Sequence, residues 1–221
     1  ESPYKNQKQQ VPHNLYVLCH DPYGQNQSAD SMSLGSAYVV KRVNNVSTPD
    51  DMIVASYVGR PNTQDEYNKN LFMLSDYYNC KIGFENDRGE VIAYAKRHRK
   101  MHRLQEEFEM LDKRELRSKT VKRQYGMHMT EARKRQGEIY IRDWLNSVRS
   151  KNEKGEQILN LHKIYDLALL QELIKFNHKG NFDRVMSLMI GMYHTRELYN
   201  AEVKEILEDN SANNWFDKNY Y

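Results

Sequence analysis

The chain has 221 residues, of which 39% are hydrophobic and 29% are charged, and its formal net charge at pH 7 is +3. This length suits one domain with a substantial core. The small net charge excludes an argument for nucleic-acid binding from total charge, so such binding must be inferred from where the charges lie. No apolar run approaches the roughly 18 residues that cross a bilayer, and no signal peptide is recognisable. We therefore expect a soluble protein with no membrane partner.

The first part of the sequence predicts an antiparallel meander. Residues 1–13 are polar and are expected to form a linker or disordered arm. The continuous apolar run at 14–19 is typical of a central strand buried on both faces. Two further strands are expected at 34–43 and 52–59, with a polar turn between them. Consecutive strands joined in this way pair antiparallel.

A helix then returns the chain to the sheet. We expect this helix at 62–79 and a short strand at 80–85, followed by a helix at 89–100. A strand that follows a helix after a meander indicates a crossover and parallel pairing. Cys19 and Cys80 fall in expected interior strands, so both are interpreted as packing groups of a reducing compartment. The apolar face predicted for the first helix consists of Tyr67, Leu71, Leu74 and Tyr78.

The second half of the sequence is predominantly helical. It begins with a charged insertion at 101–131, which is either a helix or a poorly packed segment. The other expected elements are helices at 130–150, 165–177 and 182–208, a strand or extended segment at 158–164, and a tail at 209–221. The residues predicted to face inward are Ile139, Ile141, Trp144, Leu145 and Val148 in the first of these helices, and Leu167, Leu170, Leu173 and Ile174 in the second. The expected fold class is α/β, with a mixed central sheet flanked by helices in one domain at 14–208.

Three acids stand at the ends of expected elements. Asp21 follows the first strand, Glu85 ends the strand at 80–85, and Asp183 opens the last helix. If the first and fourth strands are neighbours, Asp21 and Glu85 leave the sheet at one edge, where Asp183 could join them from a packed helix. Clustered carboxylates repel one another, and hard divalent cations would compensate their charge. Two such ions can activate a water and stabilise the leaving oxygen of a phosphodiester.

The same acids have a simpler interpretation. Asp and Glu are common at strand ends, so the three could be unrelated. Asp183 alone is explained by a favourable interaction with the helix dipole, worth about 0.3–1 kcal/mol, with Asn181 as the capping residue.

The stretches around the acids resemble one protein family. The acids lie in "YVLCHDPYG" (16–24), "IGFENDRG" (82–89) and "NFDRVMSLMI" (181–190), and "ELIKF" (172–176) precedes the third. Over roughly residues 14–195, their order and context resemble the C-terminal nuclease domain of the large terminase subunit, the genome-packaging protein of tailed bacteriophages. The resemblance implies a ribonuclease H-like fold, with Asp21, Glu85 and Asp183 as catalytic metal ligands.

The resemblance also implies an activity and partners. The activity is metal-dependent cleavage of concatemeric viral DNA in the host-cell cytoplasm, with two Mg²⁺ or Mn²⁺ ions held by the three acids and no protein nucleophile. Full-length members also have an ATPase domain and work with a small terminase subunit and a portal. No G-x-x-x-x-G-K-[ST] loop occurs in this sequence. The ATPase part is therefore expected to be absent from this chain and to lie upstream.

Positive charge is concentrated at 96–100 and 119–126, and to a lesser degree at 133–135. Lys and Arg contact phosphates without reading sequence, so we interpret the first two clusters as DNA-facing, with a solvated helix face as the alternative. The residues assigned to double-stranded DNA are Lys96, Arg97, Arg99, Lys100, Lys122 and Arg123.

Some residues and two other functions stay open. Asp30, Asp87 and His178 could assist the metal site or be ordinary surface residues. Another ribonuclease H-like nuclease, such as a transposase or junction resolvase, would use the same acids on branched or terminal-repeat DNA. In a non-catalytic module that binds nucleic acid or a partner protein, the acids would be incidental.

Overall fold

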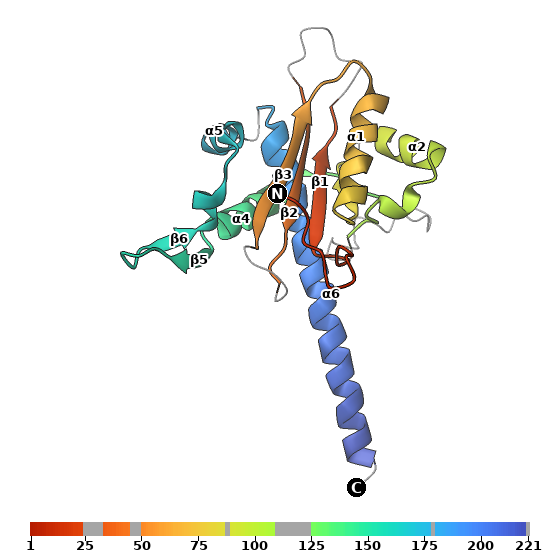
Figure 1. Cartoon of the computed structure of the whole chain (residues 1–221), viewed down its shortest axis with the longest axis vertical. Helices are drawn as coiled ribbons and strands as arrows, with labels where there is room; N and C mark the ends of the chain where they lie inside the picture. The colour runs from red at the N-terminus through yellow and green to blue at the C-terminus, as the bar shows by residue number, and fades with distance from the viewer. Residues whose placement is uncertain (24–32, 45–49, 87–88, 109–124, 178–179, 220–221) are drawn as a thin grey trace.

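Four strands form a mixed sheet flanked by helices, and two further strands form a separate hairpin (Figure 1). The computed structural model describes residues 1–23, 33–44, 50–86, 89–108, 125–177 and 180–219, and side chains as far as residue 203. In chain order the elements are β1 (Tyr16–Asp21), β2 (Gly35–Lys41), β3 (Met52–Gly59), α1 (Gln64–Tyr77), β4 (Ile82–Phe84), α2 (Glu90–Arg97), η1 (Met101–Arg103), α4 (Glu131–Leu145), β5 (Val148–Lys151), β6 (Gln157–Leu159), η2 (Asn160–Lys163), α5 (Leu167–Lys175) and α6 (Asp183–Asn219).

The strand order of the main sheet is β3-β2-β1-β4. β1 pairs with β2, and β2 with β3, in the antiparallel sense, whereas β4 lies parallel to β1 after the crossover through α1. The predicted meander, crossover and central position of the first strand are therefore confirmed. β1 is buried along its whole length, because neighbouring strands flank it and helices cover both of its faces.

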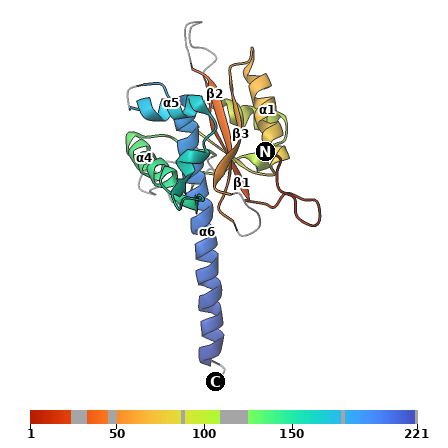
Figure 2. The same cartoon turned by 60° about the vertical axis from the view of Figure 1, so that its left-hand side comes forward.

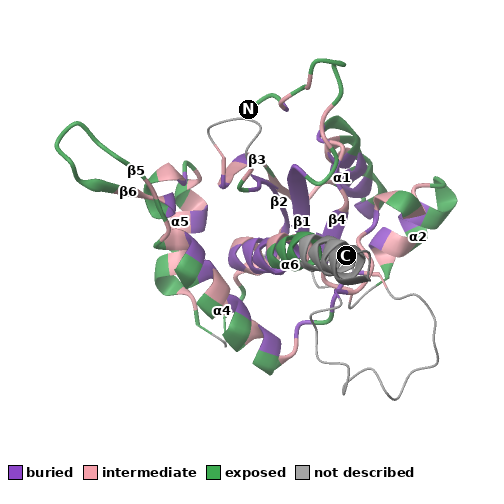
Figure 3. Ribbon diagram, turned by 90° about the horizontal axis from the view of Figure 1, so that it is seen from below, coloured by how far each residue is buried: buried purple, intermediate pink, exposed green. Residues whose placement is uncertain are grey.

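The two faces of the sheet pack against different helices. α1 and α2 cover one face, and α4, α5 and α6 cover the other (Figure 3). The side chains of β1 alternate between these layers: Leu18 belongs to the apolar cluster around α1, and Val17 and Cys19 belong to the cluster around α6. Cys19 and Cys80 are both buried free thiols, as expected.

The first turns of α6 lie directly on β1. The Ser187 hydroxyl donates a hydrogen bond to the carbonyl oxygen of Cys19 at 3.1 Å. One turn later, a Cβ atom on Gly191 would stand 2.8 Å from the Sγ atom of Cys19, so only glycine permits this approach. The rest of α6 runs beyond the sheet (Figure 2). The prediction that this helix ends near residue 208 is wrong, because the helix continues to Asn219.

The helix expected at 130–150 ends earlier than its apolar pattern predicts. α4 stops at Leu145, and Val148, assigned to its inward stripe, opens β5 and is 49% exposed. Two hydrogen bonds to one buried carboxylate explain this end. Asp51, just before β3, accepts from Trp144 Nε1 at 2.9 Å and from Asn160 Nδ2 at 2.6 Å. These bonds fix the end of α4 beside Asn160, the residue that follows the β5–β6 hairpin. The chain must therefore turn between Trp144 and Asn160.

The inward face of α5 also differs from the prediction. Leu167 and Ile174 are 72% and 84% exposed, whereas Leu169 is fully buried. Asp166 caps this helix, and its Oδ1 atom accepts from the backbone N–H groups of Ala168 and Leu169. The same carboxylate is bound to the sheet through Tyr38 at 2.6 Å, and this tether turns Leu169 toward the core.

The segments with the least regular sequence pack against the sheet. Leu104 and Met127, from the two sides of the charged insertion, form isolated bridges with Ile82 and Glu85 and are 1% exposed. The described parts of the insertion thus extend the β4 edge and are not a poorly packed segment. Residues 1–13 contain no helix or strand, and Val11 packs against the core. No helix in the described part of the chain meets the length and hydropathy of a membrane span.

Candidate metal-dependent active site

The ends of β1 and β4 bring Asp21 and Glu85 to one edge of the sheet. The two strands pair in parallel, with His20 opposite Phe84, so Asp21 and Glu85 are the next residues along each strand. The backbone N–H of Glu85 donates to the carbonyl oxygen of His20 at 3.3 Å, which continues the ladder to this point. The condition for placing Asp21 and Glu85 at one edge, namely that the first and fourth strands are neighbours, is therefore met.

Asp21 and Glu85 each stand two residues after a position that faces α6. In β1, Cys19 packs with the α6 cluster, whereas the His20 ring stacks on a tyrosine of α1 at 5.2 Å. In β4, a Cβ atom on Gly83 would meet His194 of α6 at 3.1 Å. Since side chains alternate along a strand, Asp21 and Glu85 belong to the same face as Cys19 and Gly83.

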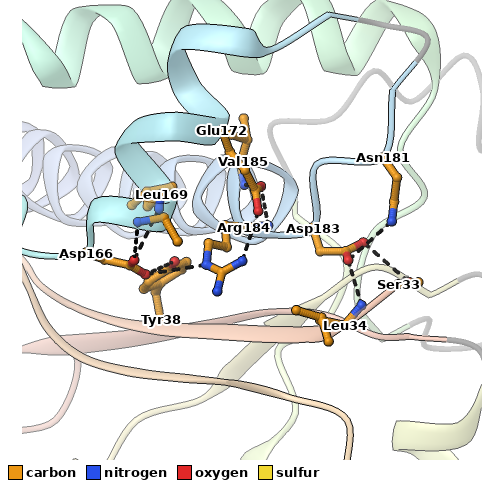
Figure 4. Close-up of polar contacts among 11 residues, drawn as sticks. Ser33, Leu34, Tyr38, Asp166, Leu169, Glu172, Asn181, Asp183, Arg184 and Val185 are labelled. Carbon is orange, nitrogen blue, oxygen red and sulfur yellow. Dashed lines mark hydrogen bonds and ion pairs between the residues drawn. The ribbon is translucent and has the colours of Figure 1, made fainter. Parts of the chain in front are cut away.

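Asp183 lies at the N-terminus of α6 and contacts the start of β2 (Figure 4). Its Oδ2 atom accepts the backbone N–H of Leu34 at 2.7 Å, and its Oδ1 atom accepts the Ser33 hydroxyl at 3.4 Å. Leu34 directly precedes β2, at the end of that strand that lies beside Asp21. Asn181, expected to cap the helix, donates instead to Oδ2 of Asp183 at 3.3 Å.

The electrostatic environment of Asp183 disfavours its charge. Burial raises the pKa of this carboxyl above its usual value, and the hydrogen bonds from Leu34, Ser33 and Asn181 offset the effect only in part. The positive charge of Arg184 is the smallest of the stabilising influences. A bound cation would remove this cost.

The acids fit a divalent metal in donor type and in their place in the fold. Carboxylate oxygens are the ligands that Mg²⁺ and Mn²⁺ prefer. Among the residues that the structure describes, however, no three or more His, Cys, Asp and Glu side chains form a group able to hold a metal ion. Binding of one ion by all three would therefore require their carboxylates to lie closer together than they do here.

A network that the sequence did not predict fixes the start of α6 (Figure 4). Glu172 of α5 accepts the backbone N–H groups of Arg184 at 3.0 Å and Val185 at 3.3 Å. Arg184 also pairs with Asp166, which in turn accepts the Tyr38 hydroxyl. Asp166 has a recognisable signal, an acid before an apolar run, but nothing in the spacing identifies Glu172.

Two of the predicted DNA-binding residues are engaged within the protein. Arg97 Nη2 pairs with Asp65 Oδ1, and Lys100 Nζ pairs with Asp76 Oδ2, each at 2.6 Å. Both acids belong to α1, so these bridges hold α2 and the following turn against α1. Lys100 and Arg97 therefore have a structural function, whatever they also contact.

The other predicted DNA-binding residues divide into exposed and undescribed ones. Lys96 and Arg99 are exposed and, within the described part of the chain, have no ion-pair partner. Arg133, from the weaker basic cluster at 133–135 that we do not assign to DNA, is 9% exposed and donates to the carbonyl oxygen of His128 at 2.6 Å. The candidate residues that lie outside the described part of the chain are Lys122, Arg123, Asp30, Asp87 and His178.

His20 is buried next to Asp21, and its contacts are structural. Its Nδ1 atom lies 3.0 Å from the carbonyl oxygen of Ser36, and its ring stacks on Tyr67. Burial lowers the pKa of His20 to about 4, so the imidazole is neutral at neutral pH. It faces the α1 layer, opposite to the face of Asp21, and we assign it no part in the candidate site.

Comparison with known proteins gives no independent assignment. No family model matches the sequence, and no curated protein matches it significantly. The function must therefore be argued from the topology and the acids of this chain.

Proposed function

We propose that this chain is a metal-dependent endodeoxyribonuclease with a ribonuclease H-like fold, acting on viral DNA as in large terminase subunits. One observation is central to the proposal. Asp21 ends β1 and Glu85 directly follows the parallel strand β4, while α6 begins at Asp183 over the same face of the sheet and near the same end. This placement of three segments far apart in the sequence supports a site formed by the three acids.

The topology supports the proposed fold. Three antiparallel strands in the order β3-β2-β1 are followed by a helix and a strand parallel to β1. A meander followed by one crossover to a strand beside β1 is compatible with a ribonuclease H-like fold. The closing helix packed over β1 agrees with the same arrangement. Other mixed sheets do not require acids at these three positions.

The chemistry follows from the donor set. Asp21, Glu85 and Asp183 would hold one or two Mg²⁺ or Mn²⁺ ions, which supply an activated water and stabilise charge on the leaving oxygen. The protein's own residues do the positioning. β1 and β4 fix two carboxylates through their register, and α6 fixes the third through its packing on Cys19. The exposed cations Lys96 and Arg99 are available to phosphates without sequence preference.

The direct test is cleavage of supercoiled plasmid in Mn²⁺ without ATP. Asp21→Asn, Glu85→Gln and Asp183→Asn should each reduce cutting by at least about 100-fold and leave DNA binding intact, because phosphate contacts lie elsewhere. Glu153→Gln, in the exposed turn of the β5–β6 hairpin, is the matched control and should cut normally. Cleavage that persists in excess EDTA would overturn the proposal.

Two further measurements separate the alternatives. Preference for a four-way junction over linear duplex would favour a resolvase that uses the same acids. A folded protein that binds DNA but shows no Mn²⁺ binding by calorimetry would favour a non-catalytic module. Affinity for DNA that depends steeply on salt and little on sequence is expected in each case, so it does not discriminate.

A further inference from the structure

The first turn of α6 is capped by a side chain from another helix. The first backbone N–H groups of a helix have no partner within it. In α6, Glu172 of α5 meets this need, since its Oε2 atom accepts from Arg184 N at 3.0 Å and Val185 N at 3.3 Å (Figure 4). Asp183 stands in this turn but directs its carboxylate to Leu34. The helix is thus capped without using Asp183.

Glu172 is itself held in place on its other side. Its Oε1 atom accepts from Arg184 Nη1 at 3.1 Å. The Nε atom of Arg184 lies 3.6 Å from Asp166 Oδ2, which accepts the Tyr38 hydroxyl of β2 at 2.6 Å. The side chains of Glu172, Arg184 and Asp166 are only 20–23% exposed, so water screens these charges less than at the surface. The network ties α5, α6 and β2 together within one turn of Asp183.

We propose that Glu172 is a positioning residue for Asp183, an inference that rests on the proposed function. Loss of the cap frees two N–H groups beside Asp183 and lets the first turn of α6 unwind or shift. The backbone that carries the Asp183 carboxylate would then no longer be held at this end of the sheet. Residues that orient metal ligands from behind typically contribute 10–100-fold to metal affinity or activity.

The test measures Mn²⁺ affinity by calorimetry and amide exchange at the start of α6. Glu172→Ala should weaken Mn²⁺ binding about 10-fold and accelerate exchange of the Arg184 and Val185 amides. Glu172→Gln should retain most of the affinity, because its amide oxygen still accepts both N–H bonds. Gln171→Ala, at an exposed neighbouring position of α5, is the control and should change neither quantity.

A double variant distinguishes positioning from a general structural role. If Glu172 acts through Asp183, Glu172→Ala should have no further effect on Mn²⁺ affinity in an Asp183→Asn background. Wild-type binding that Asp183→Asn weakens and Glu172→Ala does not would overturn this inference alone. A wild-type protein that binds no Mn²⁺ would overturn the proposed function, and this inference with it.

Discussion

At the scale of single residues, Asp183 stands in an environment that disfavours its charge. Its folded pKa lies above the usual value because of burial. A carboxyl of this kind stabilises the fold when protonated, and the contribution is lost as pH rises through the folded pKa. At neutral pH without metal, the ionised side chain is therefore a net cost, which agrees with a position kept for a ligand and not for stability.

The first prediction follows from the cost of ionising Asp183 in the folded protein. In EDTA at pH 7, Asp183→Asn should be as stable as wild type or more stable, because the charge that burial disfavours is removed while the amide oxygen can still accept from Leu34. The advantage should vanish near pH 3, where the wild-type carboxyl is protonated. Urea denaturation at both pH values measures this. Clear destabilisation at pH 7 would show that the charge serves the fold.

A second prediction separates the four cations at 96–100. Lys96→Ala with Arg99→Ala should weaken duplex binding at low salt and reduce the salt slope by up to about 0.9 per lost phosphate contact. Stability should change by less than about 0.5 kcal/mol. Arg97→Ala should instead cost about 0.2–1 kcal/mol through its bridge to Asp65. Fluorescence anisotropy and urea melts measure the two effects, and unchanged anisotropy would remove Lys96 and Arg99 from the DNA surface.

At the scale of elements, the contact between α6 and β1 gives a third prediction. Alanine is ordinarily about 1 kcal/mol better than glycine within a helix, yet Gly191→Ala should destabilise the protein by about 1–3 kcal/mol, since its Cβ would overlap Cys19 Sγ. Cys19→Ala should restore stability to the Gly191→Ala variant by removing the sulfur. Thermal unfolding of the single and double variants tests this. A stabilised Gly191→Ala protein would show that the contact is loose.

The helices and strands also show how much of the fold could be predicted from the sequence. β1, β2, β3 and the crossover are predictable, because buried strands are continuous apolar runs and a helix between strands implies parallel pairing. Asp21 and Glu85 follow from those strand ends. The end of α4 and the buried face of α5 are set by Asp51 and Asp166, which bind partners far along the chain. Such tertiary hydrogen bonds have no local pattern, and Glu172 could not be found for the same reason.

At the scale of the whole molecule, two buried histidines predict how stability depends on pH. Burial lowers the pKa of His20 to about 4 and that of His194 to about 3. The unfolded chain binds protons near pH 6.5, where the folded protein does not. Stability should thus be greatest above about pH 6.5 and fall as the pH decreases toward the folded values, with each histidine contributing up to about 1.4 kcal/mol per pH unit.

A variant tests this fourth prediction. The Nδ1 atom of His194 has no hydrogen-bond partner in the described structure, so His194→Leu removes proton uptake without removing a described hydrogen bond. Its stability should depend less on pH between about 6.5 and 4, while exposed His102→Gln should leave the wild-type slope. Urea melts across this range provide the measurement. An unaltered slope in His194→Leu would assign the pH dependence to other groups.

The position of α6 at the end of the described chain has a consequence for protein synthesis. The ribosome makes Asp21 and Glu85 long before Asp183, and α6, which covers the face of β1 formed by Val17 and Cys19, follows every other described element in chain order. A nascent or truncated chain that stops before residue 183 lacks the third carboxylate and leaves Val17 and Cys19 without their cover. Such a fragment exposes apolar sheet surface and is prone to aggregation. Incomplete copies of the proposed nuclease would thus be unable to cut DNA, so cleavage would be confined to chains whose synthesis has passed the start of α6.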